Sequence, residues 1–160
     1  MIKLRFILVG KVKDSYLKTG YEEYIKRLSK YGKVTLEYVD EEKLNDSPSK
    51  LEILKALDEE GKKVLNRIKD DEYVITCDIH GKNIDSIEFS SFLKKNIDLG
   101  KSTFTFVIGS SYGLSDLIRK RSNFLLSFSK MTFTHPLTLL LILEQVYRAF
   151  KIMNNENYQK

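Results

Sequence analysis

The feature that most constrains the fold is a regular alternation of short apolar runs with longer stretches that carry apolar residues at helical spacing. Each apolar run is followed by one helical stretch, so the chain predicts a β-α unit repeated five times. That order gives an α/β protein with a mostly parallel sheet and helices on both faces. The predicted strands are residues 2–9, 34–39, 73–79, 103–108 and 124–128, and the predicted helices are about 15–31, 48–69, 86–100, 115–121 and 136–153.

The whole chain of 160 residues is predicted to be one domain, because it has no repeat and no linker rich in Pro, Gly or Ser. Its single cysteine, Cys77, excludes an intramolecular disulfide and fits the reducing cytoplasm, where we expect the protein. The longest apolar stretch, residues 137–143, is far shorter than the ~20 residues of a membrane helix. Residues 1–10 look like a strand rather than a signal peptide. We therefore expect no membrane partner.

Charge is unevenly distributed around a net value of +5. Residues 11–33 carry seven basic and three acidic side chains, and residues 116–130 carry four basic and one acidic. Residues 37–60 carry nine acidic and three basic side chains. The two basic segments indicate a polyanionic partner such as nucleic acid, although ordinary solvated helix faces give the same pattern.

The last predicted helix is apolar on most of its sides. Such a helix must be buried on most sides. Either it is the central helix of the core, or a second subunit covers one of its faces. We favour the second explanation and expect a homodimer with twofold symmetry.

Several chemistries lack their motifs. There is no G-x-G-x-x-G after a strand, no C-x-x-C and no H-E-x-x-H, so neither a dinucleotide site nor a metal site is expected. His80 and His135 lie far apart in the sequence, and no G-x-S-x-G elbow supports a serine nucleophile. The candidates are loops at the carboxyl ends of strands, where open α/β sheets bind ligands. These loops are residues 77–81, 109–113 and 128–133.

Three segments, VIGSSYGL, LSFSKMTFTHP and LEQVYRAFKI, closely resemble the RlmH family of SPOUT methyltransferases. ILVGKVKDSYL, YEEYIKR and VITCDIHGK extend the resemblance over essentially the whole chain. It implies methylation of N3 of a pseudouridine in large-subunit (23S) ribosomal RNA, within the ribosome, by a homodimer that uses S-adenosylmethionine. It also implies a trefoil knot within about residues 73–160 that forms the cofactor pocket. General topological rules exclude knots, so only the resemblance predicts this one.

By position, the resemblance implies a set of cofactor-binding residues. A glycine also suits close approach of a ligand to backbone. The alternatives are a plain strand-end turn at the glycine, core packing for the two phenylalanines and a surface charge for the lysine. The implied residues are Cys77, Gly109, Phe128, Ser129, Lys130, Met131, Thr132 and Phe133.

Three further residues match family positions near RNA or the methyl-transfer site: His135, Arg148 and Tyr158. His135 is expected to contact phosphate, cap the last helix or accept a proton. Arg148 suits phosphate binding, or alternatively an ion pair with Glu144 four residues earlier. Tyr158 belongs either to the site or to a disordered tail.

The chain departs from the family pattern at several positions. Cys77 replaces a typical leucine, and Ser110 replaces a second glycine. Thr134 replaces a proline, Leu139 an arginine and Gln159 a histidine. The last two changes remove groups suited to RNA contact. They motivate an alternative function, a non-enzymatic RNA-binding or ribosome-binding module. A third hypothesis is an unrelated α/β enzyme that acts on a small anionic metabolite.

Overall fold

The computed structural model describes residues 1–158. Its five strands are all parallel and lie in the order β2-β1-β4-β3-β5, which confirms the predicted α/β class. The knot stays a prediction. The elements are β1 (Lys3–Val9), α1 (Ser15–Leu28), β2 (Lys33–Val39), α2 (Lys50–Leu65), β3 (Tyr73–Asn83), α3 (Ser86–Asp98), β4 (Thr103–Ile108), α4 (Asp116–Arg121), β5 (Phe124–Ser127) and α5 (His135–Met153).

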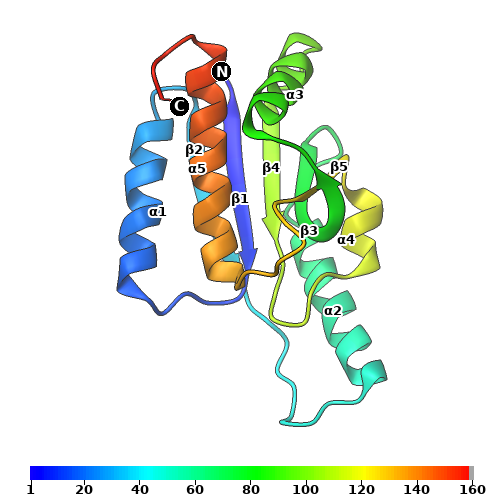
Figure 1. Cartoon of the computed structure of the whole chain (residues 1–160). Helices are drawn as coiled ribbons and strands as arrows, with labels where there is room; N and C mark the ends of the chain where they lie inside the picture. The colour runs from blue at the N-terminus through cyan, green and yellow to red at the C-terminus, as the bar shows by residue number, and fades with distance from the viewer. Residues whose placement is uncertain (159–160) are drawn as a thin grey trace.

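Helices cover both faces of the sheet (Figure 1). On one face α5 lies between α1 and α3 and packs over β1 and β4. On the other face α2 and α4 pack against each other and against β1, β2 and β3. The loop between β2 and α2 projects below the sheet with the start of α2 (Figure 1). The chain thus has three layers, with its larger core on the α5 side.

The last helix is largely buried by its own chain. Tyr21 of α1 is buried and donates a hydrogen bond to the Pro136 carbonyl (2.5 Å), and Ser90 of α3 donates to the Ala149 carbonyl (2.7 Å). Leu137 and Leu141 are partly exposed on the outer side. Packing within its own chain therefore accounts for most of the apolar faces of this helix. Its buried residues are Leu139, Ile142, Leu143, Val146, Tyr147, Ala149 and Phe150.

Several element boundaries differ from prediction, and two of the differences have a clear structural cause. The second helix begins at Lys50 rather than at Pro48, because Ser49 and Glu52 form a reciprocal capping box. The third strand runs to Asn83 rather than to residue 79. It leaves the ladder after Cys77 and rejoins β5 at Lys82, and both residues pair opposite Leu126. The excursion between them places residues 78–81 at the carboxyl edge of the sheet.

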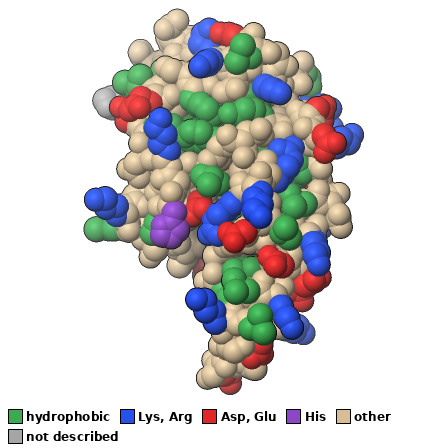
Figure 2. All heavy atoms as spheres, turned by 90° about the vertical axis from the view of Figure 1, so that its right-hand side faces the viewer, with side chains coloured by type: hydrophobic (Ala, Val, Ile, Leu, Met, Phe, Trp, Pro, Cys, Tyr) green, Lys and Arg blue, Asp and Glu red, His purple; other side chains and the backbone are tan. Residues whose placement is uncertain are grey.

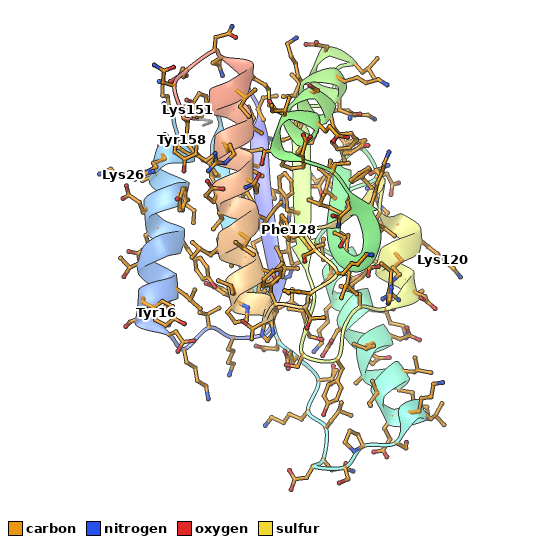
Figure 3. The ribbon with its side chains drawn as sticks, viewed as in Figure 1. Tyr16, Lys26, Lys120, Phe128, Lys151 and Tyr158 are labelled. Atoms are coloured by element: carbon orange, nitrogen blue, oxygen red, sulfur yellow. The ribbon has the colours of Figure 1, made fainter. Side chains whose placement is uncertain are left out.

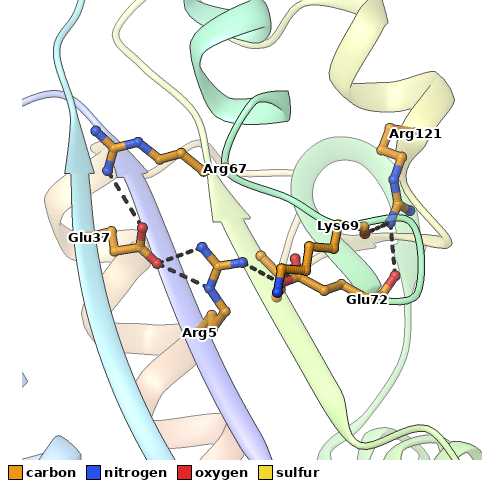
Figure 4. A network of polar contacts seen from close by, with 7 residues as sticks. Arg5, Glu37, Arg67, Lys69, Glu72 and Arg121 are labelled. Carbon is orange, nitrogen blue, oxygen red and sulfur yellow. Dashed lines mark hydrogen bonds and ion pairs between the residues drawn. The ribbon is translucent and has the colours of Figure 1, made fainter.

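A polar network replaces apolar packing at the amino ends of the strands on the α2 side (Figure 4). The Arg5 guanidinium contacts the carboxylates of Glu37 (2.8 Å) and Glu72. Glu72 is nearly buried and also accepts a hydrogen bond from Thr105 Oγ1 (3.1 Å). Arg121 donates to the Glu72 carbonyl (2.9 Å). The network joins β1, β2, β4 and the segment before β3.

We expect Glu72→Ala to lower the free energy of unfolding by about 2 kcal/mol, since it leaves Arg5 and Thr105 partly unpaired in a buried place. Glu23→Ala removes the exposed Glu23–Arg27 pair and should cost less than about 0.5 kcal/mol. Urea unfolding followed by circular dichroism measures both. Equal losses for the two variants would show that the network adds nothing to stability.

Candidate active site

A cavity of about 360 Å³ lies at the carboxyl ends of β3, β4 and β5. All three loops predicted from the sequence contribute to it: residues 77–80, residues 109–113 and residues 127–133. The first turn of α5 closes one side through His135 and Thr138. Because all strands are parallel, segments far apart in the sequence meet at this one edge.

The structure places most of the predicted cofactor residues in the cavity wall. Figure 3 shows Phe128 on the segment that crosses from β5 toward α5. Lys130 is exposed and is not among the lining residues. The predicted residues that line the cavity are Cys77, Gly109, Phe128, Ser129, Met131, Thr132 and Phe133.

The deepest part of the wall is apolar. Ile108 and Leu126 are buried ends of β4 and β5, and Cys77 lies beside them in β3. Burial, with the nearby Asp78 carboxylate, raises the pKa of Cys77 to about 12. At neutral pH Cys77 is therefore a neutral thiol that acts as an apolar wall group rather than as a nucleophile.

Gly109 is required by the packing of its own loop. A Cβ there would lie 2.5 Å from Leu114 Cδ2 and 2.9 Å from the Gly113 carbonyl oxygen. The missing side chain at Gly109 therefore allows residues 113 and 114 to pack closely against it, so that the loop folds back on itself. Ser110 and Gly113 exchange backbone hydrogen bonds of 3.2 and 3.0 Å across that turn.

Helix α2 anchors this loop from below. Ser110 Oγ donates to the buried carboxylate of Glu60 (2.9 Å), and Ser115 Oγ donates to Asp58 (2.7 Å). Burial raises the pKa of Glu60. Ser110 is a position where the chain departs from the family pattern, and its hydroxyl supplies a contact that glycine lacks.

Asp78 and Arg119 form an ion pair in the cavity wall that the sequence did not reveal. Asp78 Oδ2 accepts from Arg119 Nε (2.8 Å), and Asp78 Oδ1 accepts from the backbone of His80 (3.0 Å). The Asp78 side chain is 3 % exposed, and the Arg119 side chain is 34 % exposed. Although burial opposes it, the bond from Arg119 lowers the pKa of Asp78. The pair fixes the excursion of β3 against α4, 41 residues further along the chain.

His135 is the first residue of α5, and it lines the cavity. Its side chain is 18 % exposed, and burial lowers its pKa, so the neutral imidazole predominates at pH 7. Among the residues proposed to be catalytic, this one meets the predicted cofactor loop within a single chain.

Arg148 and Tyr158 lie near the other end of α5. Figure 3 shows Tyr158 beside Lys151, well away from Phe128. Arg148 follows His135 by thirteen positions, which is roughly 20 Å along a helix. Arg148 pairs with Glu144, as its spacing allows, and stacks its guanidinium 4.6 Å from the centre of the Tyr158 ring. Tyr158 also donates to Glu144 (3.0 Å), so it is packed on the helix.

The two departures from the family pattern that remove groups suited to RNA contact are Leu139 and Gln159. Leu139 is fully buried in the core, so it presents nothing to a ligand. Gln159 lies outside the described residues.

The surface near α4 carries mixed charge. Figure 2 shows basic and acidic side chains interspersed on the face that carries α3, β5 and α4. Arg119 is paired with Asp78 and Asp116, and Arg121 donates to the carbonyls of Lys69 and Glu72. Part of the basic segment 116–130 thus serves the fold.

Comparison with known proteins settles the family. A family model described as "Predicted SPOUT methyltransferase" matches residues 2–159. A protein of Clostridium botulinum (strain Alaska E43 / Type E3) named "Ribosomal RNA large subunit methyltransferase H" is 47 % identical over 99 % of this chain and 100 % of its own length. The chain belongs to the SPOUT methyltransferase family. Relatives with the same name in Clostridium tetani and Enterococcus faecalis are 46 % and 43 % identical over the same shares.

Solved structures support the SPOUT fold. A probable methyltransferase from Bordetella pertussis matches with a TM-score of 0.57 over 92 % of this chain and 94 % of that one, at 12 % identity. A probable methylase family protein from Haemophilus influenzae matches with a TM-score of 0.56 over 98 % of this chain and 70 % of that one, at 14 % identity. At such low identity these likenesses show the fold alone.

Among residues 1–158, no group of three or more His, Cys, Asp or Glu residues is arranged to hold a metal ion. Within the same residues, no helix has the length and hydropathy to cross a bilayer.

We expect Asp78→Asn to lower the free energy of unfolding by about 1–2 kcal/mol at pH 7, less than for a fully buried pair because Arg119 is one third exposed. Because folding lowers the pKa of Asp78, its contribution is present above the usual value of 3.8 and is lost as the pH falls below it. The gap between wild type and variant should therefore shrink at pH 3.

Asp116→Asn is the matched control, since Asp116 binds the same arginine but its side chain is 81 % exposed. It should cost less than about 0.5 kcal/mol at either pH. Urea unfolding at pH 7 and pH 3 provides both comparisons. A pH-independent gap for Asp78→Asn would rule out the ion pair as the source of its stability.

Proposed function

We propose that this SPOUT protein methylates N3 of a pseudouridine in large-subunit ribosomal RNA, with S-adenosylmethionine as methyl donor, in the cytoplasm. The supporting observation is that the segments shared with the family form one continuous cavity wall. Relatives named ribosomal RNA large subunit methyltransferase H match over their full length, so the chain has the same extent as those proteins. The assembled ribosome or its large subunit is the proposed RNA partner.

The cavity fits the proposed cofactor in size and chemistry. Its volume of about 360 Å³ lies within the usual range of small-molecule sites. Apolar groups such as Ile108, Leu126 and Phe128 suit an adenine ring and a thioether, and the flanking loops offer backbone polar groups. When bound, S-adenosylmethionine supplies an electrophilic methyl group on a sulfonium.

The protein's own contribution is orientation and proton removal. Loops held by Glu60, Asp58 and the Asp78–Arg119 pair form a fixed cavity wall, and a fixed geometry is worth much of the barrier in a transfer reaction. N3 of the target base carries a proton that must leave. In our proposal the neutral imidazole of His135 accepts it, since His135 borders the cavity and burial lowers its pKa.

We further propose that the active form is a homodimer in which α5 of one subunit packs antiparallel to α5 of the other. The outer side of α5 carries Leu137, Leu141, Glu144, Arg148 and Ile152 at helical spacing, all partly exposed. A twofold axis near Leu141 would bring the Arg148 end of one subunit to the His135 end of its partner. In this arrangement, His135 of one subunit and Arg148 of the other would contribute to one site, although the two residues lie far apart within a single chain.

The central test is methylation of large ribosomal subunits that lack the modification, with the product nucleoside identified by mass spectrometry. We expect Gly109→Ala to abolish methylation and weaken cofactor binding at least tenfold in calorimetry, since its Cβ would force Leu114 and the loop to shift.

Gly100→Ala is the matched control. Unlike Gly109, Gly100 has a positive φ, +97°, so alanine there strains the backbone, but its Cβ meets nothing within 4 Å, and the turn between α3 and β4 contributes no residue to this cavity. It should lose stability but keep cofactor affinity. Wild-type protein that binds the cofactor and ribosomes without methyl transfer would instead support a non-enzymatic RNA-binding module.

The dimer proposal predicts complementation between two inactive variants, His135→Ala and Arg148→Ala. If each site takes one residue from each subunit, a heterodimer contains one intact site. An equal mixture formed by co-expression should then regain about a quarter of wild-type activity, because half of the dimers are mixed and half of their sites are intact. No recovery in mixtures shown to exchange subunits would place both residues in one chain's site.

A further inference from the structure

Four segments converge beside the cavity around one carboxylate. Glu41 lies in the loop between β2 and α2, and its Oε1 is 3.7 Å from Nε2 of His135. Ser111, in the loop after β4, donates to the same oxygen from Oγ (3.2 Å) and from its backbone N–H (3.4 Å). Glu41 is thereby held between the loop after β4 and the start of α5.

Gly10 at the end of β1 makes this meeting possible. A Cβ at Gly10 would lie 2.8 Å from His135 Nε2 and 2.9 Å from Glu41 Oε1. Gly10 also has a φ of +129°, which side chains rarely adopt. The imidazole and the carboxylate thus both pack against the backbone at Gly10, and a side chain there would push them apart.

The surroundings of His135 otherwise disfavour its protonation. Burial lowers its pKa, and the amino end of α5 adds partial positive charge. Asp78, His80 and Arg119 line the same cavity from β3 and α4, and Asp78 and Arg119 neutralise each other. Glu41 raises the pKa of His135 and so opposes these effects.

We propose that Glu41 is a positioning residue that holds the His135 imidazole with Nε2 toward the carboxylate and Nδ1 toward the cavity. This inference rests on the proposed function, which it extends to a residue in the acidic segment 37–60. The N3 proton passes to Nδ1, the electron pair left on N3 forms the bond to the methyl carbon, and the electron pair of the broken carbon–sulfur bond stays on sulfur. The resulting imidazolium lies 3.7 Å from a carboxylate that stabilises it.

The test is Glu41→Gln, which keeps the shape and removes the charge. Glu42→Gln is the matched control, because the neighbouring Glu42 carboxylate pairs with Lys63 (2.8 Å) instead. The chain has two histidines, so a pH titration of the imidazoles by NMR reports His135 once its signal is assigned. We expect the pKa of His135 to fall in Glu41→Gln and to be unchanged in Glu42→Gln.

Methylation kinetics supply the second readout. In Glu41→Gln we expect kcat to fall roughly fivefold with KM nearly constant, and the acidic limb of the pH–kcat profile to move to lower pH. A merely structural role would change stability or KM without moving that limb. An unchanged pKa of His135, equal shifts in both variants, or a shifted pKa with an unchanged pH–kcat profile would each overturn the proposal.

The two arms also separate this inference from the function on which it rests. The NMR titration needs only the free protein, so it reads the Glu41–His135 pair even if wild-type protein methylates no RNA. Absence of methylation by wild type would overturn the proposed function, whereas a failed titration beside active wild type would overturn only the role of Glu41.

Discussion

The burial of α5 against the middle of the sheet is the constraint on which the rest of the structure depends. The chain reaches this helix from β5, an edge strand, yet α5 packs over β1 and β4. Residues 128–134 must therefore cross the carboxyl ends of the strands between them, and that crossing supplies one wall of the cavity. The position of the site thus follows from where the most apolar helix can be buried. No further interaction is needed to bring residues 128–134 to the carboxyl edge of the sheet.

The opposite face of the sheet, covered by α2 and α4, relies more on polar contacts. Its apolar core is smaller, and at the amino ends of the strands it gives way to the Arg5–Glu72 network. Toward the carboxyl ends, Asp58 and Glu60 of α2 bind the loop after β4 through Ser115 and Ser110. The carboxylates of the acidic segment 37–60 therefore have several roles. Some of them hold the cavity loops, and others are exposed to solvent in the loop that projects between β2 and α2.

The sequence predicted the elements and the location of the site much better than their connections. Apolar periodicity found all five strands and all five helices, and the rule for parallel sheets indicated the loops that form the cavity. The strand order, the return of β3 to β5 after Cys77, and the Asp78–Arg119 pair depend on contacts between distant segments, which periodicity does not encode. Glu41 was hidden for a related reason, since one carboxylate in an acidic loop carries no local signal. The prediction of a knot came from the family resemblance alone.

The role of α5 also explains why one helix carries so many of the proposed functional residues. A group on the first turn of a buried helix is held more precisely than one on a loop, because the helix is fixed by its whole length against α1 and α3. His135 has that position, and Pro136 beside it is bonded to the buried Tyr21. The same helix presents Arg148 on its outer side, braced by Glu144 and Tyr158. A rigid helix with the proposed base at one end and a guanidinium near the other suits a symmetric pair, because two antiparallel copies place unlike ends side by side. In such a pair, the packing that stabilises each chain would also set the distance between the two groups to which we assign the proposed catalysis.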